Sequence, residues 1–116
     1  MARTTLVKTI APGAYDDAGA EVVMAAADTV DKNQFLCSGK DLVVAFNSGA
    51  NPRTVTIDST DDERGRQEDI TAEAIAAGTV RIFGPFEPMG WRQVGTGYIY
   101  LEASDADVLL GVIQLP

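Results

Sequence analysis

Carboxylates are the side chains of this chain that could carry acid–base chemistry, because its 116 residues include no histidine and one cysteine, Cys37. Histidine is the commonest general base and the commonest ligand of transition metals. Glu87, Glu102, Asp105 and Asp107 lie near turn-like stretches, where acidic side chains ordinarily accept backbone hydrogen bonds. The sequence shows no nucleophile with a base and an orienting group in the pattern that enzymes use. We therefore expect a protein that is not an enzyme.

A second group of carboxylates, between residues 58 and 69, could offer oxygen ligands to a calcium ion. The spacing is not that of an EF-hand, and Arg64 and Arg66 at the centre of the group would repel a cation. Residues 60–69 include no apolar side chain, which favours a solvated charged loop. We expect neither a metal nor a cofactor. The carboxylates are those of Asp58, Asp61, Asp62, Glu63, Glu68 and Asp69.

The charge of the chain argues against anionic partners. Nine Lys and Arg residues against seventeen Asp and Glu residues give a formal net charge of −8, and the basic residues are spread along the sequence. Such a protein repels phosphate backbones and anionic lipids, so we expect no nucleic acid as a partner. The sequence has no secretory signal pattern and no apolar run of about 18 residues, so we expect synthesis in the cytosol and no membrane span. Cys37 follows Phe35 and Leu36, which favours a buried free thiol.

Short β-branched and aromatic runs alternate with turn residues along most of the chain, which predicts strands. Within 53–59, Val55 and Ile57 alternate with polar residues, so one face should be buried and one solvated. The nearly continuous apolar run of 108–115 predicts a central strand covered on both faces. Residues 70–75 fit a strand, although a helix over 68–77 competes because alanine favours helix. Further strands are expected over 34–37, 42–46, 79–83, 91–94 and 98–102, with a short one over 21–27.

About eight strands at spacings of roughly ten residues predict an all-β fold, either a small antiparallel β-sandwich or a jelly-roll-like barrel. Residues 1–17 are mostly polar and small and end near a Pro-Gly turn. They predict an extended N-terminal arm or a first edge strand, with a frayed terminus as the alternative. The predicted organisation is an arm over 1–17 followed by one β-sandwich domain over 18–116.

An aromatic bend precedes the last strands. Phe83, Phe86, Met89 and Trp91 lie among glycines and prolines, and the two prolines lack the donors that a central strand needs. One interpretation is a bend that caps the core. The other is that Phe86 and Met89 project as an apolar contact for another subunit.

Five stretches of the second half, over residues 36–116, have a distinctive order: Val44-Ala45-Phe46-Asn47-Ser48-Gly49-Ala50, Arg53-Thr54-Val55-Thr56-Ile57, Gly65-Arg66-Gln67-Glu68-Asp69-Ile70-Thr71, Gly84-Pro85-Phe86 and Gly90-Trp91-Arg92-Gln93. In this order they resemble short virion proteins of tailed bacteriophages, encoded in head-structure modules. The small proteins of this kind resemble head decoration, or capsid cement, proteins. The family brings no functional residues that could be transferred to positions of this sequence.

The resemblance implies a non-enzymatic virion protein that binds the major capsid protein on the outer capsid surface and stabilises the shell, often as a trimer. An acidic β-module with a polar arm would suit such docking through the arm and through edge-strand pairing. The expected capsid or subunit contacts are Arg3, Thr4, Thr5, Leu6, Val7, Phe86 and Met89.

Two other functions remain open. A head–tail connector or tail component would also be a small β protein, present in few copies. A carbohydrate-binding or receptor-binding module would need an exposed aromatic platform, for which Tyr98, Tyr100 and Trp91 are the candidates. If Ile99 and Leu101 line the core, both tyrosines face outward, because alternate residues of a strand share a face.

Overall fold

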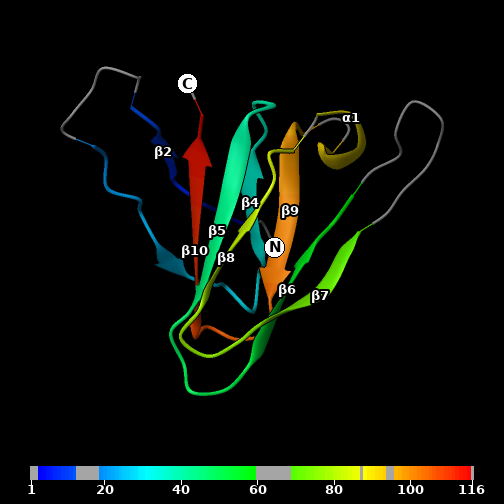
Figure 1. The fold of residues 1–116 in the computed structure, drawn as a ribbon. Helices are drawn as coiled ribbons and strands as arrows, with labels where there is room; N and C mark the ends of the chain where they lie inside the picture. The colour runs from blue at the N-terminus through cyan, green and yellow to red at the C-terminus, as the bar shows by residue number, and fades with distance from the viewer. Residues whose placement is uncertain (1–2, 13–18, 60–68, 87, 94–95, 116) are drawn as a thin grey trace.

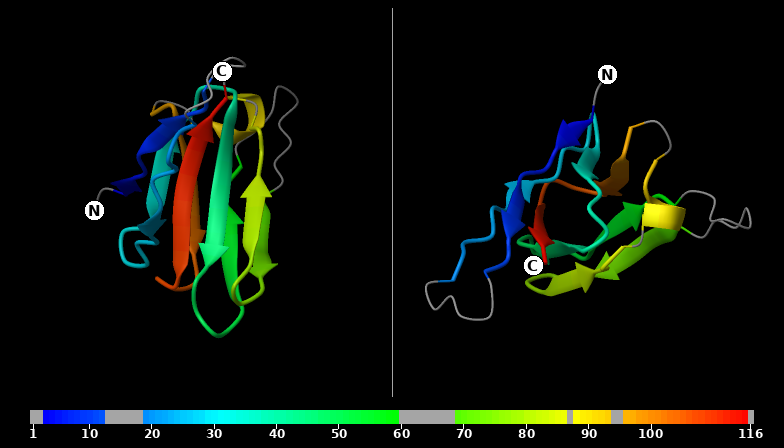
Figure 2. Two further views of the ribbon diagram at one scale, coloured as in Figure 1. Left: turned by 60° about the vertical axis from the view of Figure 1, so that its left-hand side comes forward. Right: turned by 90° about the horizontal axis from the view of Figure 1, so that it is seen from above.

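The computed structural model describes residues 3–12, 19–59, 69–86, 88–93 and 96–115. In this part of the chain, ten strands form two mixed five-stranded sheets, and one helical turn lies between the eighth and ninth strands (Figure 1). The two sheets face each other, as the right panel of Figure 2 shows from above, and buried apolar side chains fill the space between them. The expected all-β sandwich is confirmed.

Sheet A contains, in spatial order, β1 (Thr4–Thr5), β4 (Asn33–Leu36), β9 (Tyr98–Ala103), β6 (Arg53–Ile57) and β7 (Ile70–Ile75). All neighbours in this sheet are antiparallel except β1, which runs parallel to β4. Sheet B contains β2 (Lys8–Ile10), β10 (Val108–Gln114), β5 (Asp41–Asn47) and β8 (Val80–Phe83), and the two-residue β3 (Ala25–Ala26) also pairs with β10. Here β2 runs parallel to β10, and the other pairs are antiparallel. The expectation of an antiparallel sandwich was therefore wrong for these two N-terminal strands.

The core follows the two-residue period of the strands. Sheet A contributes buried side chains from β4, β9, β6 and β7, and sheet B contributes them from β5, β8 and β10. Packing of these side chains against one another removes apolar surface from water, which is the main favourable term in folding. The largest fully buried apolar side chains are Phe35, Ile57, Ile75, Ile99, Leu101 and Leu110.

Most of the predicted strands are confirmed within one or two residues, including the strand over 70–75 that competed with a helix. The strand expected over 91–94 is wrong for its described residues. Trp91 instead ends the turn α1 (Pro88–Trp91), in which Gly90 has φ 103° and the Arg92 N–H donates to the Pro88 carbonyl at 3.0 Å. Trp91 packs edge-on against Phe86 with ring centroids 5.1 Å apart, which holds the bend against the core. Of the strand expected over 21–27, only Ala25 and Ala26 pair.

The segment expected to be an N-terminal arm is part of the sandwich over its described residues 3–12. It adds β1 to the edge of sheet A and then crosses to add β2 to the edge of sheet B. Leu6, between these strands, is 5% exposed and belongs to the core. The edge-strand alternative is therefore confirmed for these residues. Among the described residues, no helix is long and apolar enough to cross a membrane.

Candidate interaction surface

The outer faces of the two sheets differ in chemistry. On sheet A the outward side chains of β4, β6 and β9 are mostly polar. On sheet B every outward position of β5, β8 and β10 is apolar or glycine, and we call this surface the apolar face. It consists of Leu42, Val44, Phe46, Val80, Ile82, Leu109, Gly111 and Ile113.

The strand register makes the apolar face continuous. Val44 lies between Ile82 on β8 and Gly111 on β10, and Phe46 lies between Val80 and Leu109. Val80 is 55% exposed and Ile82 is 63% exposed, while the outward residues of β5 are partly buried by their neighbours. The left panel of Figure 2 shows β10, β5 and β8 side by side at the front of the molecule. A contiguous exposed apolar surface on a soluble fold marks an interaction site more often than scattered apolar residues do.

Among the described residues, the segment around Met24 covers the apolar face at Gly111. A Cβ atom built on Gly111 would lie 2.6 Å from the Met24 sulfur and 3.0 Å from Val22 Cγ1, so a larger residue there would displace this cover. The cover is tied down at Thr9, whose hydroxyl donates to the Glu21 carbonyl and accepts from the Val23 N–H, both at 3.2 Å. The prediction that β10 is covered on both faces is confirmed at this point, whereas Val80 and Ile82 remain open.

The charged residue of β8 turns away from the apolar face. Arg81 pairs in register with the buried Ala45, so its side chain points toward sheet A. Its Nη2 forms an ion pair with Glu73 at 3.0 Å, and its Nη1 donates to the Ala74 carbonyl at 3.1 Å. This link joins the open edges of the two sheets and leaves the outward row of β8 to two aliphatic side chains.

The outer face of sheet A carries the predicted tyrosine pair. Ile99 and Leu101 are buried, so Tyr98 and Tyr100 face outward, as the alternation requires. The Arg3 guanidinium lies 4.3 Å from the centroid of the Tyr100 ring, and Arg3 also donates to the carbonyls of Asn33 and Leu101 at 3.0 and 3.3 Å. One face of the Tyr100 ring is therefore occupied by a cation–π contact and is not free to stack on a sugar.

An open depression of about 280 Å³ lies over β6 and the end of β9 on sheet A. Lys32 and Glu102 form an ion pair of 3.1 Å within it, so its two charged groups neutralise each other. At the margin of the same face, burial raises the pKa of Asp58, although Arg3 opposes the shift. The depression therefore offers hydroxyls and one neutralised ion pair to a ligand. The depression is lined by Thr29, Lys32, Thr54, Thr56, Glu102, Ala103 and Ser104.

The N-terminal residues predicted to contact a partner are mostly used inside the fold. Leu6 is in the core and Arg3 binds sheet A, so neither is presented to a partner. The Thr4 hydroxyl donates to Asp28, and the Thr5 hydroxyl accepts from Gln34. Val7, at 62% exposed, is the residue of this group whose apolar side chain is open.

The two contacts predicted in the aromatic bend, Phe86 and Met89, differ in exposure. Phe86 is 3% exposed and packs between Phe35 and Trp91, so its assignment as a subunit contact was wrong and the core-capping interpretation holds. Met89 is 58% exposed. The difference arises because Met89 lies in the turn α1, where the backbone leaves helical geometry.

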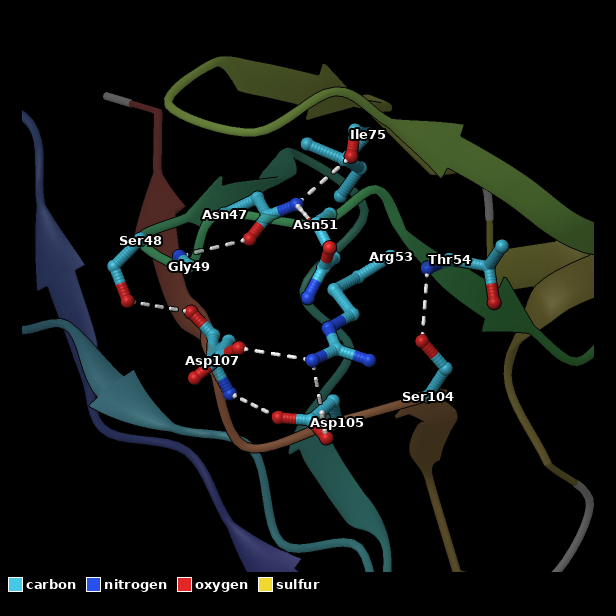
Figure 3. A network of polar contacts seen from close by, with 10 residues as sticks. All are labelled: Asn47, Ser48, Gly49, Asn51, Arg53, Thr54, Ile75, Ser104, Asp105 and Asp107. Atoms are coloured by element: carbon cyan, nitrogen blue, oxygen red, sulfur yellow. Dashed lines mark hydrogen bonds and ion pairs between the residues drawn. The ribbon is translucent and has the colours of Figure 1, made fainter.

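Two of the carboxylates that were weighed as acid–base candidates, Asp105 and Asp107, connect two loops (Figure 3). Arg53 Nη2 lies 3.1 Å from Asp107 Oδ2 and 3.6 Å from Asp105 Oδ2. The Asp107 carbonyl also accepts from the Ser48 hydroxyl at 2.7 Å, and Asp105 Oδ1 accepts from the Asp107 N–H at 2.9 Å. These contacts fasten the loop after β5 to the loop before β10. Glu87 and residues 60–68 of the predicted acidic loop lie outside the described residues, and the described part of the chain contains no metal-binding cluster of His, Cys, Asp or Glu.

Three buried polar residues, Asn33, Asp41 and Asn47, were not singled out in the sequence. Asp41 and Asn47, at opposite ends of β5, both point inward and are fully buried. Asp41 Oδ1 pairs with Lys8 Nζ at 2.9 Å, and its carboxylate also accepts two hydrogen bonds from Ser38. Asn47 donates to the Asn51 and Ile75 carbonyls at 2.7 and 3.0 Å. The alternation of β5 places both Asp41 and Asn47 inward, and this pattern could have identified them as buried from the sequence.

Comparison with known proteins gives no assignment. No family model matches this chain, and neither the curated proteins nor the solved structures contain a match.

Proposed function

We propose that this chain is a non-enzymatic structural protein of a tailed-phage virion that decorates the outer capsid surface and stabilises it. Its partners are the major capsid protein and other copies of itself. The observation that carries the proposal is the apolar face of sheet B, because an exposed apolar sheet face is a surface for contact with protein. The resemblance of the sequence to head decoration proteins supports the virion as the setting.

The rest of the surface fits an assembly role. Most of the described carboxylates are used in ion pairs and hydrogen bonds, as in the network of Arg53, Asp105 and Asp107. The compact sandwich has its two N-terminal edge strands pinned by Leu6 and by the Lys8–Asp41 pair. A small face gives modest affinity for each contact, and repetition on a closed lattice raises the effective concentration of every further contact.

The copy number of the protein in purified phage particles tests this proposal. Quantitative mass spectrometry against the major capsid protein gives a ratio near one if the whole lattice is decorated. A handful of copies per particle would instead identify a head–tail connector or tail component. Absence from the particles would refute the virion role.

A glycan-binding module is the second candidate, because Tyr98 and Tyr100 do face outward on sheet A, the sheet that also carries the polar depression. The contact of Arg3 with the Tyr100 ring counts against it. A glycan array with the wild type and Tyr98→Ala and Tyr100→Ala variants decides this point. Binding that is lost in either variant would favour the module, and no binding by the wild type would dismiss it.

A further inference from the structure

We propose that the polar depression on the outer face of sheet A binds one neutral sugar unit through Glu102, Lys32 and the hydroxyls around them. The inference is independent of the virion role, because the depression lies on the sheet opposite the apolar face. It also names a different site from that of the second candidate function, because neither Tyr98 nor Tyr100 lines the depression.

Three segments of the chain line the depression: the turn before β4, the outward side of β6, and the end of β9. Thr56 pairs in register with Glu102, so a hydroxyl and a carboxylate lie on neighbouring strands. Six of the seven lining residues are polar, and the volume of about 280 Å³ is close to the lower end of the range of small-molecule sites, about 300–1,000 Å³. Such a lining suits a small ligand with many hydroxyls rather than an apolar one.

The hydroxyls of the depression have protons to donate. Thr56 Oγ1 accepts from the Ala72 N–H, and Ser104 Oγ accepts from the Thr54 N–H, both at 3.0 Å. Because a hydroxyl has one proton besides its acceptor lone pairs, both can still donate to a ligand. Within the described part of the chain, the hydroxyls of Thr29 and Thr54 take part in no hydrogen bond. All four are therefore available to the hydroxyls of a sugar.

The charges that line the depression favour a neutral ligand. Glu102 Oε2 lies 3.1 Å from Lys32 Nζ, so the two charged lining residues are paired with each other. The pair still offers further ammonium protons and a second carboxylate oxygen. Sugar hydroxyls both donate and accept, so they can use both groups without separating the pair.

Four other carboxylates lie within two sequence positions of a lining residue. Those of Asp58 and Asp105 are each paired with an arginine. The carboxylate of Asp28 accepts one hydroxyl and two backbone N–H groups. The fourth, that of Asp31, adds a negative charge that would repel an anion.

Two unusual backbone conformations hold polar groups of the depression in place. Lys32 and Ala72 are the non-glycine residues with positive φ among those that the structure describes, at 67° and 49°. Lys32 follows the turn before β4, and its Nζ forms the ion pair of the depression. Ala72 lies at the register shift between β6 and β7, where its N–H binds Thr56 Oγ1. Such conformations are uncommon for residues with a Cβ atom, and they gather at functional sites.

NMR titration of the isotope-labelled protein with glucose, galactose, mannose and N-acetylglucosamine, each up to about 100 mM, tests the site. For one sugar unit on an open surface we expect a Kd of about 1–10 mM with at least one of them. The largest shifts should be those of the Thr54, Thr56 and Ser104 amides. Thr54→Val removes a hydroxyl that the fold does not use and should weaken binding about three- to tenfold. Glu102→Ala removes a charged acceptor and should weaken it at least tenfold.

Thr71→Val is the matched control, because Thr71 is an exposed residue of β7 that does not line the depression. This variant should bind like the wild type. The spectrum of each variant shows whether it folds, and Thr29→Val, in an exposed turn, serves as a second variant. Glucuronate and glucosamine carry opposite charges and should bind no more tightly than glucose.

Absence of shifts with all four neutral sugars at about 100 mM would overturn the site, since this is well above the expected Kd. So would unchanged binding by both folded variants, Thr54→Val and Thr29→Val, or tighter binding of a charged sugar. Binding that is lost in Tyr98→Ala but kept in Thr54→Val would place the sugar on the tyrosine pair and overturn the depression. The copy number in particles is a separate measurement, so absence from particles would refute the virion role alone.

Discussion

Leu6→Ala tests whether the N-terminal segment is part of the fold or a free arm available to a capsid. Leu6 is 5% exposed, and its N–H donates to the Gln34 carbonyl at 2.8 Å. Truncating a buried leucine to alanine costs about 2–5 kcal/mol. Because Leu6 lies at the margin of the core, where the chain crosses between the sheets, we expect about 2–3 kcal/mol at the lower end of that range. A free arm would show no loss.

Val7→Ala is the matched control, since Val7 is the next residue and is 62% exposed. We expect its effect to stay within about 0.5 kcal/mol. Urea unfolding measures both: with a slope of about 1–3 kcal/mol per molar, Leu6→Ala should lower the midpoint by about 0.7–3 M while the slope is unchanged. Midpoints that agree for the two variants would refute the integration of this segment. They would restore the arm as a docking element.

Three further variants or modifications probe the buried polar groups and the cysteine. Asn47→Ala removes the hydrogen bonds that the side-chain amide donates to the Asn51 and Ile75 carbonyls and accepts from the Gly49 N–H, and should cost about 2–4 kcal/mol in urea unfolding; a loss below about 1 kcal/mol would contradict this role. Lys8→Met leaves the carboxylate of Asp41 buried without its ammonium partner and should cost about 2–4 kcal/mol, which a wild-type midpoint would disprove. Burial raises the pKa of the Cys37 thiol above its ordinary value of 9.0. At pH 9 the folded protein therefore holds less thiolate than the urea-unfolded protein and should react more slowly with iodoacetamide. Equal rates would count against this shift.

The strands were predictable because their signals are local. Residues 41–47 and 108–114 are apolar runs bounded by turn residues, and both became central strands of sheet B. The alternation in 53–57 placed Val55 and Ile57 inside, as expected. The failure at 91–93 arises from packing rather than from strand propensity, because Trp91 packs on Phe86 and the chain turns through α1 there. The parallel pairing of β1 with β4 and of β2 with β10 could not be predicted from local sequence either. These partners lie about 30 and 100 residues away in the sequence.

The candidate surface was only partly predictable. The sequence correctly placed Tyr98 and Tyr100 on an outer face, because the period of a strand decides that once Ile99 and Leu101 are in the core. It could not show that Arg3 would lie on the Tyr100 ring, since these residues meet only through the pairing of β1, β4 and β9. It also assigned Phe86 to a contact surface, whereas the packing of Phe35 and Trp91 encloses it.

The sequence by itself determined that this is an acidic all-β protein without histidine, and it determined which residues could alternate between core and surface. Composition and strand period suffice for that, because they act within a few neighbouring residues. Only the tertiary structure decided which apolar side chains would stay exposed. Leu42, Val44 and Phe46 look like core residues in the sequence, yet they lie on the outward side of β5 and are only partly buried, and Val80 and Ile82 beside them are exposed. An apolar face stays open when no further layer of the fold packs on it, and the number of layers depends on the whole chain.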